Sequence, residues 1–268
     1  MKHKLLAVSL LCLALSATSV HATLLYWSAN GSTVAGSGTW DTGNHWGTST
    51  SGPFTTAWNN ANSDTALFPG IGTAFAVSLG MNATINGTLQ LELTPGTYPD
   101  WTFNLNTSTL TFAPGSTLQA NGGCVLNCKY AGTITKNGAG YTTFNNSGGS
   151  VTKFIFKGGN SYFASPNRFG SGADNSGFLT FDGGLLRMDT TTAWTQGKSI
   201  TVNSGNGTIM SYSSTITLTQ DKPITFNGGN LSLARNGSTP FTCILSGTGS
   251  SGSGTLTVSV PTTCNASP

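Results

Sequence analysis

The stretch that decides the fold reads G-T-I-T-K-N-G-A-G-Y-T-T-F and runs from Gly132 to Phe144. Two short runs of β-favouring residues, 133–135 and 141–144, flank a turn at 136–140 that contains two glycines. Glycine enters left-handed backbone conformations without steric cost, so this turn can redirect the chain sharply between strands. The stretch therefore predicts a strand, a corner and a second strand, with Lys136 solvated at the corner.

The same pattern recurs from residue 73 onward. Short segments alternate apolar residues with Thr, Ser or Asn, which places the apolar side chains on one face of each strand. The clearest run has leading apolar positions 7 to 9 residues apart, at Ile200, Ile209, Ile216, Ile224 and Leu231. Strands this short form either a sandwich or barrel, or a parallel β-helix. The irregular step with one apolar side favours the β-helix, with coils of roughly 24 residues and on the order of ten coils.

The composition indicates an ordered β protein with an uncharged polar surface. Charged residues make up 7% of the 268 residues, against roughly 25% in average globular proteins, and there are 36 glycines. Hydroxyl and amide side chains therefore supply most of the surface polarity. Recurrent alternating runs of Val, Ile, Leu, Phe and Tyr distinguish the chain from a disordered linker.

The N-terminus has the three regions of a secretory signal peptide. A basic start with Lys2 and Lys4 precedes an apolar run at 5–15 and small residues at 17–22, and the best cleavage point follows Ala22. The apolar run is shorter than the about 20 residues that a membrane-spanning helix needs, and no later stretch replaces it. Cleavage would lower the formal charge from +3 to +1, because two lysines and no acids leave. We therefore expect no nucleic-acid partner and no membrane span.

Residues 23–70 differ from the rest because aromatic side chains crowd among turn residues. We interpret this region as an aromatic-rich N-terminal cap, and residues 71–268 as the solenoid. A stacked β structure has an open sheet edge at each end, which a cap would cover. The alternative is a carbohydrate-binding module, in which flat indole rings stack on sugars. Its candidate glycan-stacking residues are Trp27, Trp40, Trp46 and Trp58.

Four cysteines follow the predicted signal peptide, an even number that suits an exported chain with disulfides. They are Cys124, Cys128, Cys243 and Cys264, and three connectivities could join them. The simplest pairs Cys124 with Cys128 and Cys243 with Cys264. A four-cysteine zinc site is the alternative, although neither spacing has the usual two-residue gap.

The sequence predicts no catalytic centre, cofactor or metal. The few acids include one local group, Asp174, Asp182 and Asp189 with Arg187. A polysaccharide lyase or hydrolase would need Asp182 or Asp189, whereas the simpler role of Asp182 is to cap a glycine turn. His45 is the only histidine after the signal peptide, and no G-x-S-x-G motif accompanies it, so we interpret it as a turn residue of the cap.

The stretch 132–140, followed by Asn160-Ser-Tyr162, resembles the autotransporter-associated β-strand repeat, whose core runs G, L, T, K, x, G, x, G and then N, x, Y. Residues 26–70 also resemble the lead-in segment of exported proteins that carry these repeats. The resemblance implies a passenger-type, right-handed parallel β-helix presented outside the cell. Two features depart from the pattern: an insertion at 151–159, and an end at Pro268 without the amphipathic strands of an outer-membrane barrel.

These expectations converge on an exported surface or extracellular β-solenoid that is not an enzyme and acts as a structural or adhesin-like passenger module. The periplasm is an alternative location. Its expected partner is an extracellular surface glycan or protein. The carbohydrate-binding module and, behind it, the polysaccharide-degrading enzyme remain the alternatives.

Overall fold

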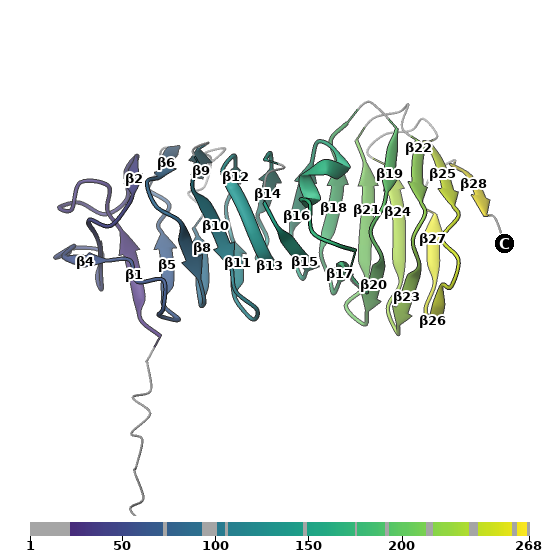
Figure 1. The fold of residues 1–268 in the computed structure, drawn as a ribbon, viewed down its shortest axis with the longest axis horizontal. Helices are drawn as coiled ribbons and strands as arrows, with labels where there is room; N and C mark the ends of the chain where they lie inside the picture. Colours follow the sequence, from purple (N-terminus) through teal and green to yellow (C-terminus); the bar gives the residue numbers. More distant parts are fainter. Residues whose placement is uncertain are drawn as a thin grey trace, which may run out of the picture.

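The computed structural model describes residues 22–71, 74–92, 101–104, 107–146, 149–174, 176–190, 193–212, 217–235, 241–258 and 262–266. The predicted signal peptide therefore lies outside the described residues, apart from its last position. The described chain is an elongated stack of strands, coloured in sequence order along the long axis (Figure 1). Nearly all strand pairs are parallel, which confirms the predicted parallel β-solenoid.

Two large sheets and one small sheet form the sides of the solenoid. The 14-stranded sheet contains β1 (Leu24–Trp27), β3 (Asn44–Gly47), β4 (Thr56–Ala57), β5 (Thr65–Phe68), β7 (Ala83–Ile85), β8 (Thr88–Leu91), β10 (Thr109–Phe112), β11 (Thr117–Ala120), β13 (Lys129–Asn137), β15 (Val151–Phe156), β17 (Leu179–Phe181), β20 (Ile200–Asn203), β23 (Ile224–Asn227) and β26 (Ser251–Ser253). The 10-stranded sheet contains β2 (Gly38–Trp40), β6 (Phe75–Leu79), β9 (Trp101–Asn104), β12 (Cys124–Leu126), β14 (Tyr141–Phe144), β16 (Asn160–Phe163), β18 (Leu185–Met188), β21 (Gly207–Ser211), β24 (Leu231–Arg235) and β27 (Leu256–Val258). The 4-stranded sheet contains β19 (Trp194–Gln196), β22 (Thr217–Gln220), β25 (Phe241–Leu245) and β28 (Thr262–Ala266), and a 3-10 turn, η1, spans Pro166–Phe169.

The coils stack in register, so that similar side chains form ladders through the core. Ile200 lies opposite Ile224, and Phe144 lies opposite Phe163 with the two rings stacked 4.7 Å apart. Buried and less buried positions alternate along most strands, as in β10, β11 and β16. Each inward residue therefore packs against its counterparts in the neighbouring coils, and a buried Leu, Ile or Phe contributes about 1.5–3 kcal/mol.

The length of a coil varies along the chain. Paired positions are about 18 residues apart at Cys124 and Thr142 and about 25 residues apart at Ser161 and Leu186, around the roughly 24 expected. The 10-stranded sheet supplies one strand to each successive coil.

The central stretch forms the predicted strand, corner and strand. β13 ends at Asn137, Gly138 takes a φ of 82°, and β14 begins at Tyr141. A second corner lies at Gly132, within β13, where φ is 83°. The first part of β13 pairs with β10 and the last part pairs with β11, so Gly132 marks the bend between two sides of the solenoid.

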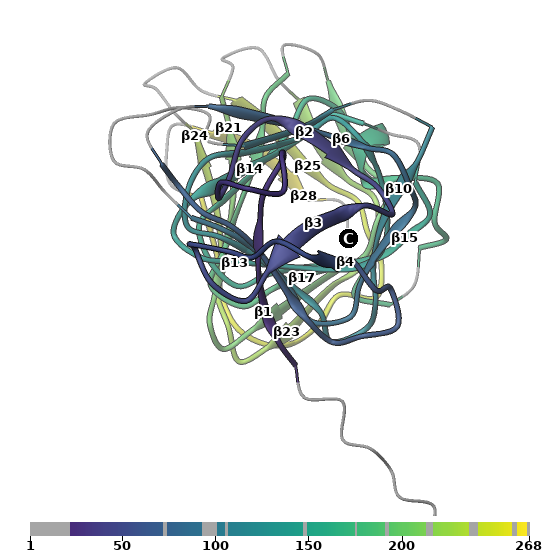
Figure 2. The same cartoon turned by 90° about the vertical axis from the view of Figure 1, so that its left-hand side faces the viewer.

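The N-terminal end is closed by antiparallel strands. β3 pairs with β1 and β4 pairs with β3, both antiparallel, and Figure 2 shows β3 and β4 in front of the ring of coils. Both large sheets nevertheless begin within residues 23–70, since β1 pairs with β5 and β2 with β6 in parallel. Residues 23–70 therefore contain both the closing strands and the first strands of the two large sheets.

Candidate functional site

The four tryptophans predicted to stack on glycans are core residues. Trp27, Trp40 and Trp46 have 0% of their surface exposed and Trp58 has 5%. Their rings lie 5.1–5.3 Å apart, mostly edge to face, and pack with Phe68. Because aromatic side chains bury large apolar areas, this cluster fills the end of the solenoid behind β3. The hypothesis of sugar stacking by these residues is therefore wrong, and they pack inside the predicted cap.

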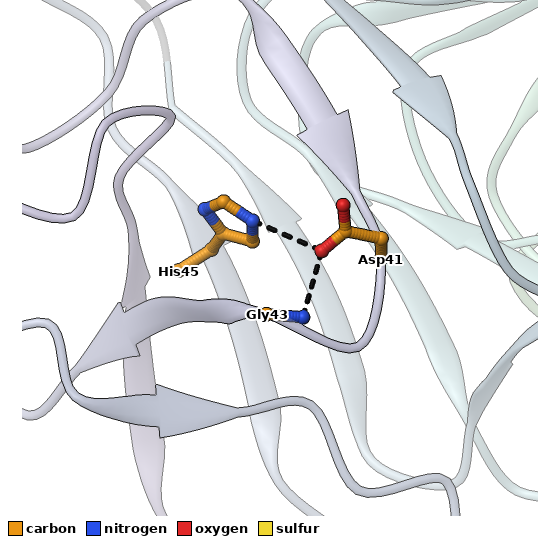
Figure 3. Close-up of polar contacts among 3 residues, drawn as sticks. All are labelled: Asp41, Gly43 and His45. Carbon is orange, nitrogen blue, oxygen red and sulfur yellow. Dashed lines mark hydrogen bonds and ion pairs between the residues drawn. The ribbon is translucent and has the colours of Figure 1, made fainter.

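The contact between His45 and Asp41 stabilises the turn between β2 and β3 (Figure 3). Asp41 Oδ1 lies 3.0 Å from His45 Nε2 and accepts a 2.7 Å hydrogen bond from the Gly43 N–H. The other ring nitrogen, Nδ1, is buried without a hydrogen-bond partner, and the ring packs 5.3 Å from that of Trp27. A catalytic base needs a nitrogen that reaches a substrate. This geometry instead suits a structural role, although His45 lies in β3 and only its side chain contacts the turn in which the sequence placed it.

The acidic group considered for polysaccharide cleavage is dispersed into separate structural contacts. Asp174 accepts hydrogen bonds from the N–H and hydroxyl of Ser199 at 2.8 and 3.0 Å, and Asp182 accepts one from the Gly205 N–H at 3.3 Å. Asp189 accepts a 2.6 Å hydrogen bond from Arg187 Nε. Asp182 thus caps a glycine turn as expected, but the turn belongs to the next coil.

Cys128 is a buried free thiol, so the predicted bridge between Cys124 and Cys128 is not formed. Cys124 opens the extended strand β12, and the run to Leu126 alone advances the chain about 7 Å, at the limit of disulfide Cα spacing. The second predicted pair stays a prediction. Register places Cys243 beside Cys264, but the Cys264 side chain lies outside the described structure.

We expect Cys128 to resist thiol reagents in the folded chain. Burial raises the pKa of its thiol from 9.0 to about 12, which lowers the thiolate fraction on the order of 1000-fold. Mass spectrometry of the peptide that contains Cys128 should show no alkylation at pH 8 in the native chain and full alkylation in denaturant. Rapid labelling of the native chain would contradict the buried position.

Lys136 is fully buried, so its predicted solvation at the corner is wrong. Register places it inward between Leu118 and Phe156 of the neighbouring coils, a position that apolar residues hold elsewhere. The Nζ atom donates hydrogen bonds to the carbonyl oxygens of Gly138, Gly140 and Gly158, at 3.0, 2.8 and 3.0 Å. Burial lowers its pKa to about 8, and the protonated amine has three N–H donors, one for each carbonyl. Lys136 is a structural cation.

The outward face of the 10-stranded sheet carries an aromatic and cationic ladder. The rings of Tyr141 and Tyr162 stack 5.4 Å apart at 12°. The guanidinium of Arg187 follows, with Cζ 4.5 Å from the Tyr162 ring and 4.0 Å from the ring of Tyr212. Tyr212 is 53% exposed. We call these four residues the tyrosine ladder.

Beside the ladder, two hollows lie in series along the corner where the 10-stranded sheet begins. The first has a volume of about 440 Å³ and is lined by Tyr141, Asn160, Tyr162 and the glycine corners of two coils. The second has a volume of about 460 Å³ and is lined by Asn206, Thr208, Asn230 and further glycines. They lie on neighbouring coils, because Asn160 of the first hollow pairs with Leu185, the residue after Gly184 of the second hollow. We call the two hollows together the corner groove.

The motif Asn160-Ser-Tyr162 is visible in the sequence, but its residue types alone predict no site. The detectable signal was the polar side of the alternating strands beside the glycine turns, which becomes one face when the coils stack. No helix in the described part of the chain is both long and apolar enough to cross a bilayer. The same residues hold no group of three or more His, Cys, Asp or Glu side chains that could bind a metal ion.

Comparison with known proteins gives one informative relative. The chain is 33% identical, over 217 residues, to the Adhesin BmaC autotransporter of Brucella suis biovar 1 (strain 1330). The match covers 76% of this chain and 6% of that protein, so the chain is similar to a small segment of it. No family model matches the sequence, and no solved structure gives a significant match.

Proposed function

Because the chain is a β-solenoid related in sequence to an autotransporter adhesin, we propose that it is an exported, surface-displayed module with an adhesin-like role and no catalytic activity of its own. The observation that carries this proposal is the match over 76% of the chain, which spans most of the stacked coils and not one repeat alone. Repeats of short strands resemble one another easily, so a match of this length is the stronger support.

The arrangement of polar and aromatic side chains on the surface supports a binding role more than a catalytic one. Loops and turns that present side chains from a rigid scaffold are common binding sites. Here the coils hold the tyrosine ladder and corner groove on one face, while Asp174, Asp182 and Asp189 each serve a local contact. A hydrolase or lyase needs acids that converge on one substrate bond.

Export and attachment test the proposal separately. Expression of residues 1–268 in a Gram-negative host should release or display a chain whose N-terminus is Thr23, measured by N-terminal sequencing of the exported fraction. Beads coated with residues 23–268 should then attach to cultured cells or matrix above the level of albumin-coated beads, and soluble chain should compete. Retention of the chain in the cytoplasm, or attachment equal to albumin, would overturn the proposal.

A further inference from the structure

Building on the proposed adhesin-like function, we propose that the corner groove binds a linear, neutral polysaccharide that runs along the axis of the solenoid. The site is formed by the two hollows on neighbouring coils and bordered by the tyrosine ladder. It replaces the N-terminal tryptophans as the glycan site, because those rings lie inside the cap. Three features of the groove support this site: the chemistry of its lining, the repeat of its polar groups along the axis and the position of the tyrosine hydroxyls.

The lining of the groove offers amides, hydroxyls and backbone groups. Among the described residues that line the two hollows, none has a charged side chain. A nucleic acid would need cations against its phosphates, and a peptide would need apolar pockets for its side chains. Sugar hydroxyls are both donors and acceptors, so they match a surface of Asn, Thr, Ser and Tyr. The uncharged polar lining therefore favours a neutral glycan.

The polar groups repeat with the coils. Asn206 Oδ1 accepts a hydrogen bond from the Asn230 N–H at 2.8 Å, and Asn230 Oδ1 accepts one from the Thr255 N–H at 2.9 Å. These bonds fix equivalent residues at successive levels about 4.8 Å apart, the spacing of adjacent strands. A pyranose unit in an extended polysaccharide has a similar length. Successive sugars can therefore meet equivalent groups on successive coils.

The tyrosines contribute their edges and hydroxyls. The faces of Tyr141 and Tyr162 cover each other, and Arg187 covers the outer face of Tyr162. Asn160 Nδ2 donates a 3.3 Å hydrogen bond to the Tyr162 hydroxyl, which fixes that oxygen at the rim of the first hollow. The geometry points to recognition by hydrogen bonds at the rim, with little stacking on sugar faces.

The experiment measures binding of residues 23–268 to a β-glucan, a mannan and a xylan, with hyaluronate and heparin as acidic comparisons. Affinity electrophoresis screens the five polymers, and calorimetry follows with oligosaccharides of two to eight units. We expect at least one neutral polymer to bind, with affinity that rises with chain length as more coils are contacted. Binding only to an acidic polymer, or to none of the five, would overturn the inference.

Three substitutions by arginine test where on the surface the polysaccharide binds. Ala139→Arg fills the first hollow and Thr255→Arg fills the second, and we expect each to weaken binding at least tenfold. Ala164→Arg is the matched control, because Ala164 is an exposed alanine at the opposite end of β16, and binding should change less than twofold. All three sites are exposed, so unchanged thermal unfolding should accompany these results. Equal binding by all three variants would overturn the proposal that the corner groove is the glycan-binding site.

The outcome is separable from that of the proposed function. If beads coated with Ala139→Arg still attach to cells while glycan binding is lost, the groove binds glycans and another surface mediates attachment. If the parent chain attaches to cells yet binds none of the five polymers, the adhesin-like function stands and the glycan inference fails.

Discussion

Replacing Lys136 with methionine should lower the free energy of unfolding by roughly 2–4 kcal/mol, measured by chemical denaturation at pH 7. Methionine matches the length of lysine and suits the apolar ladder of Leu118 and Phe156. It cannot donate to the carbonyl oxygens of Gly138, Gly140 and Gly158, which three charge-assisted hydrogen bonds now satisfy. We expect the free energy lost with these bonds to exceed the free energy gained because a cation is no longer buried.

The matched control is Lys157→Met, which makes the same substitution at an exposed lysine one coil further along the solenoid. Exposed substitutions away from special contacts usually change stability by about 0.5 kcal/mol or less. An equal, small effect at both lysines would contradict the structural role of Lys136.

The pH dependence gives a second measurement of the same group. The pKa of Lys136, lowered by burial, is about 8 in the folded chain, against an ordinary value of 10.5. Between these values the unfolded chain holds a proton that the folded chain has lost, so the contribution of Lys136 to stability rises with pH. The stability gap between the parent chain and Lys136→Met should therefore widen from pH 8 to pH 10. A constant gap would contradict the lowered pKa.

The comparison with Lys136→Met is necessary because two other buried groups titrate in the opposite sense. Burial raises the pKa of Cys128 from 9.0 to about 12, and burial also raises the pKa of Tyr130. Above their ordinary pKa values the unfolded chain loses these protons first, so both groups reduce stability as the pH rises. Subtracting the variant removes their contribution, which is common to both chains.

The sequence predicted the repeating architecture well because alternation and glycine turns are local signals. The strand, corner and strand at 132–144 follow from the residues themselves, and so does the inward face of segments such as Thr109–Phe112, in which buried and less buried residues alternate. The burial of Lys136 could not be read in the same way. Its position within the alternation indicated an inward side chain, but its charge indicated solvent. The carbonyl oxygens that resolve this conflict come from glycine corners on two successive coils.

The candidate site was missed because it depends on which residues become neighbours between coils. The number of residues in a coil differs along the chain: 18 residues separate the paired Cys124 and Thr142, and 25 separate the paired Ser161 and Leu186. Distance in the sequence therefore does not fix the register between coils. The stacking of Tyr141 on Tyr162 appears only once β14 and β16 are paired. The tryptophans were ambiguous for a different reason: aromatic residues suit both a core and a sugar surface, and only burial distinguishes the two.

The second large effect is expected at Gly132, where alanine should lower the free energy of unfolding by about 4 kcal/mol or more. The backbone has a φ of 83°, and an added Cβ would lie 2.0 Å from the carbonyl oxygen of Phe112 in the preceding coil. Because this neighbour is backbone held by the sheet, it cannot rotate away as a side chain would. Relief of the contact requires β10 and β13 to separate, which weakens their hydrogen bonds.

A control for Gly132→Ala lies just after β10. Gly115 has a φ of 87°, and an added Cβ there would meet no atom within 4 Å. Gly115→Ala therefore carries only the backbone penalty, about 1 kcal/mol, so the difference between the two variants measures the close approach of successive coils. Denaturation of both variants by urea provides the comparison. Similar losses would mean that φ alone requires glycine at this corner, whereas a much larger loss at Gly132 would show that the spacing between coils requires it.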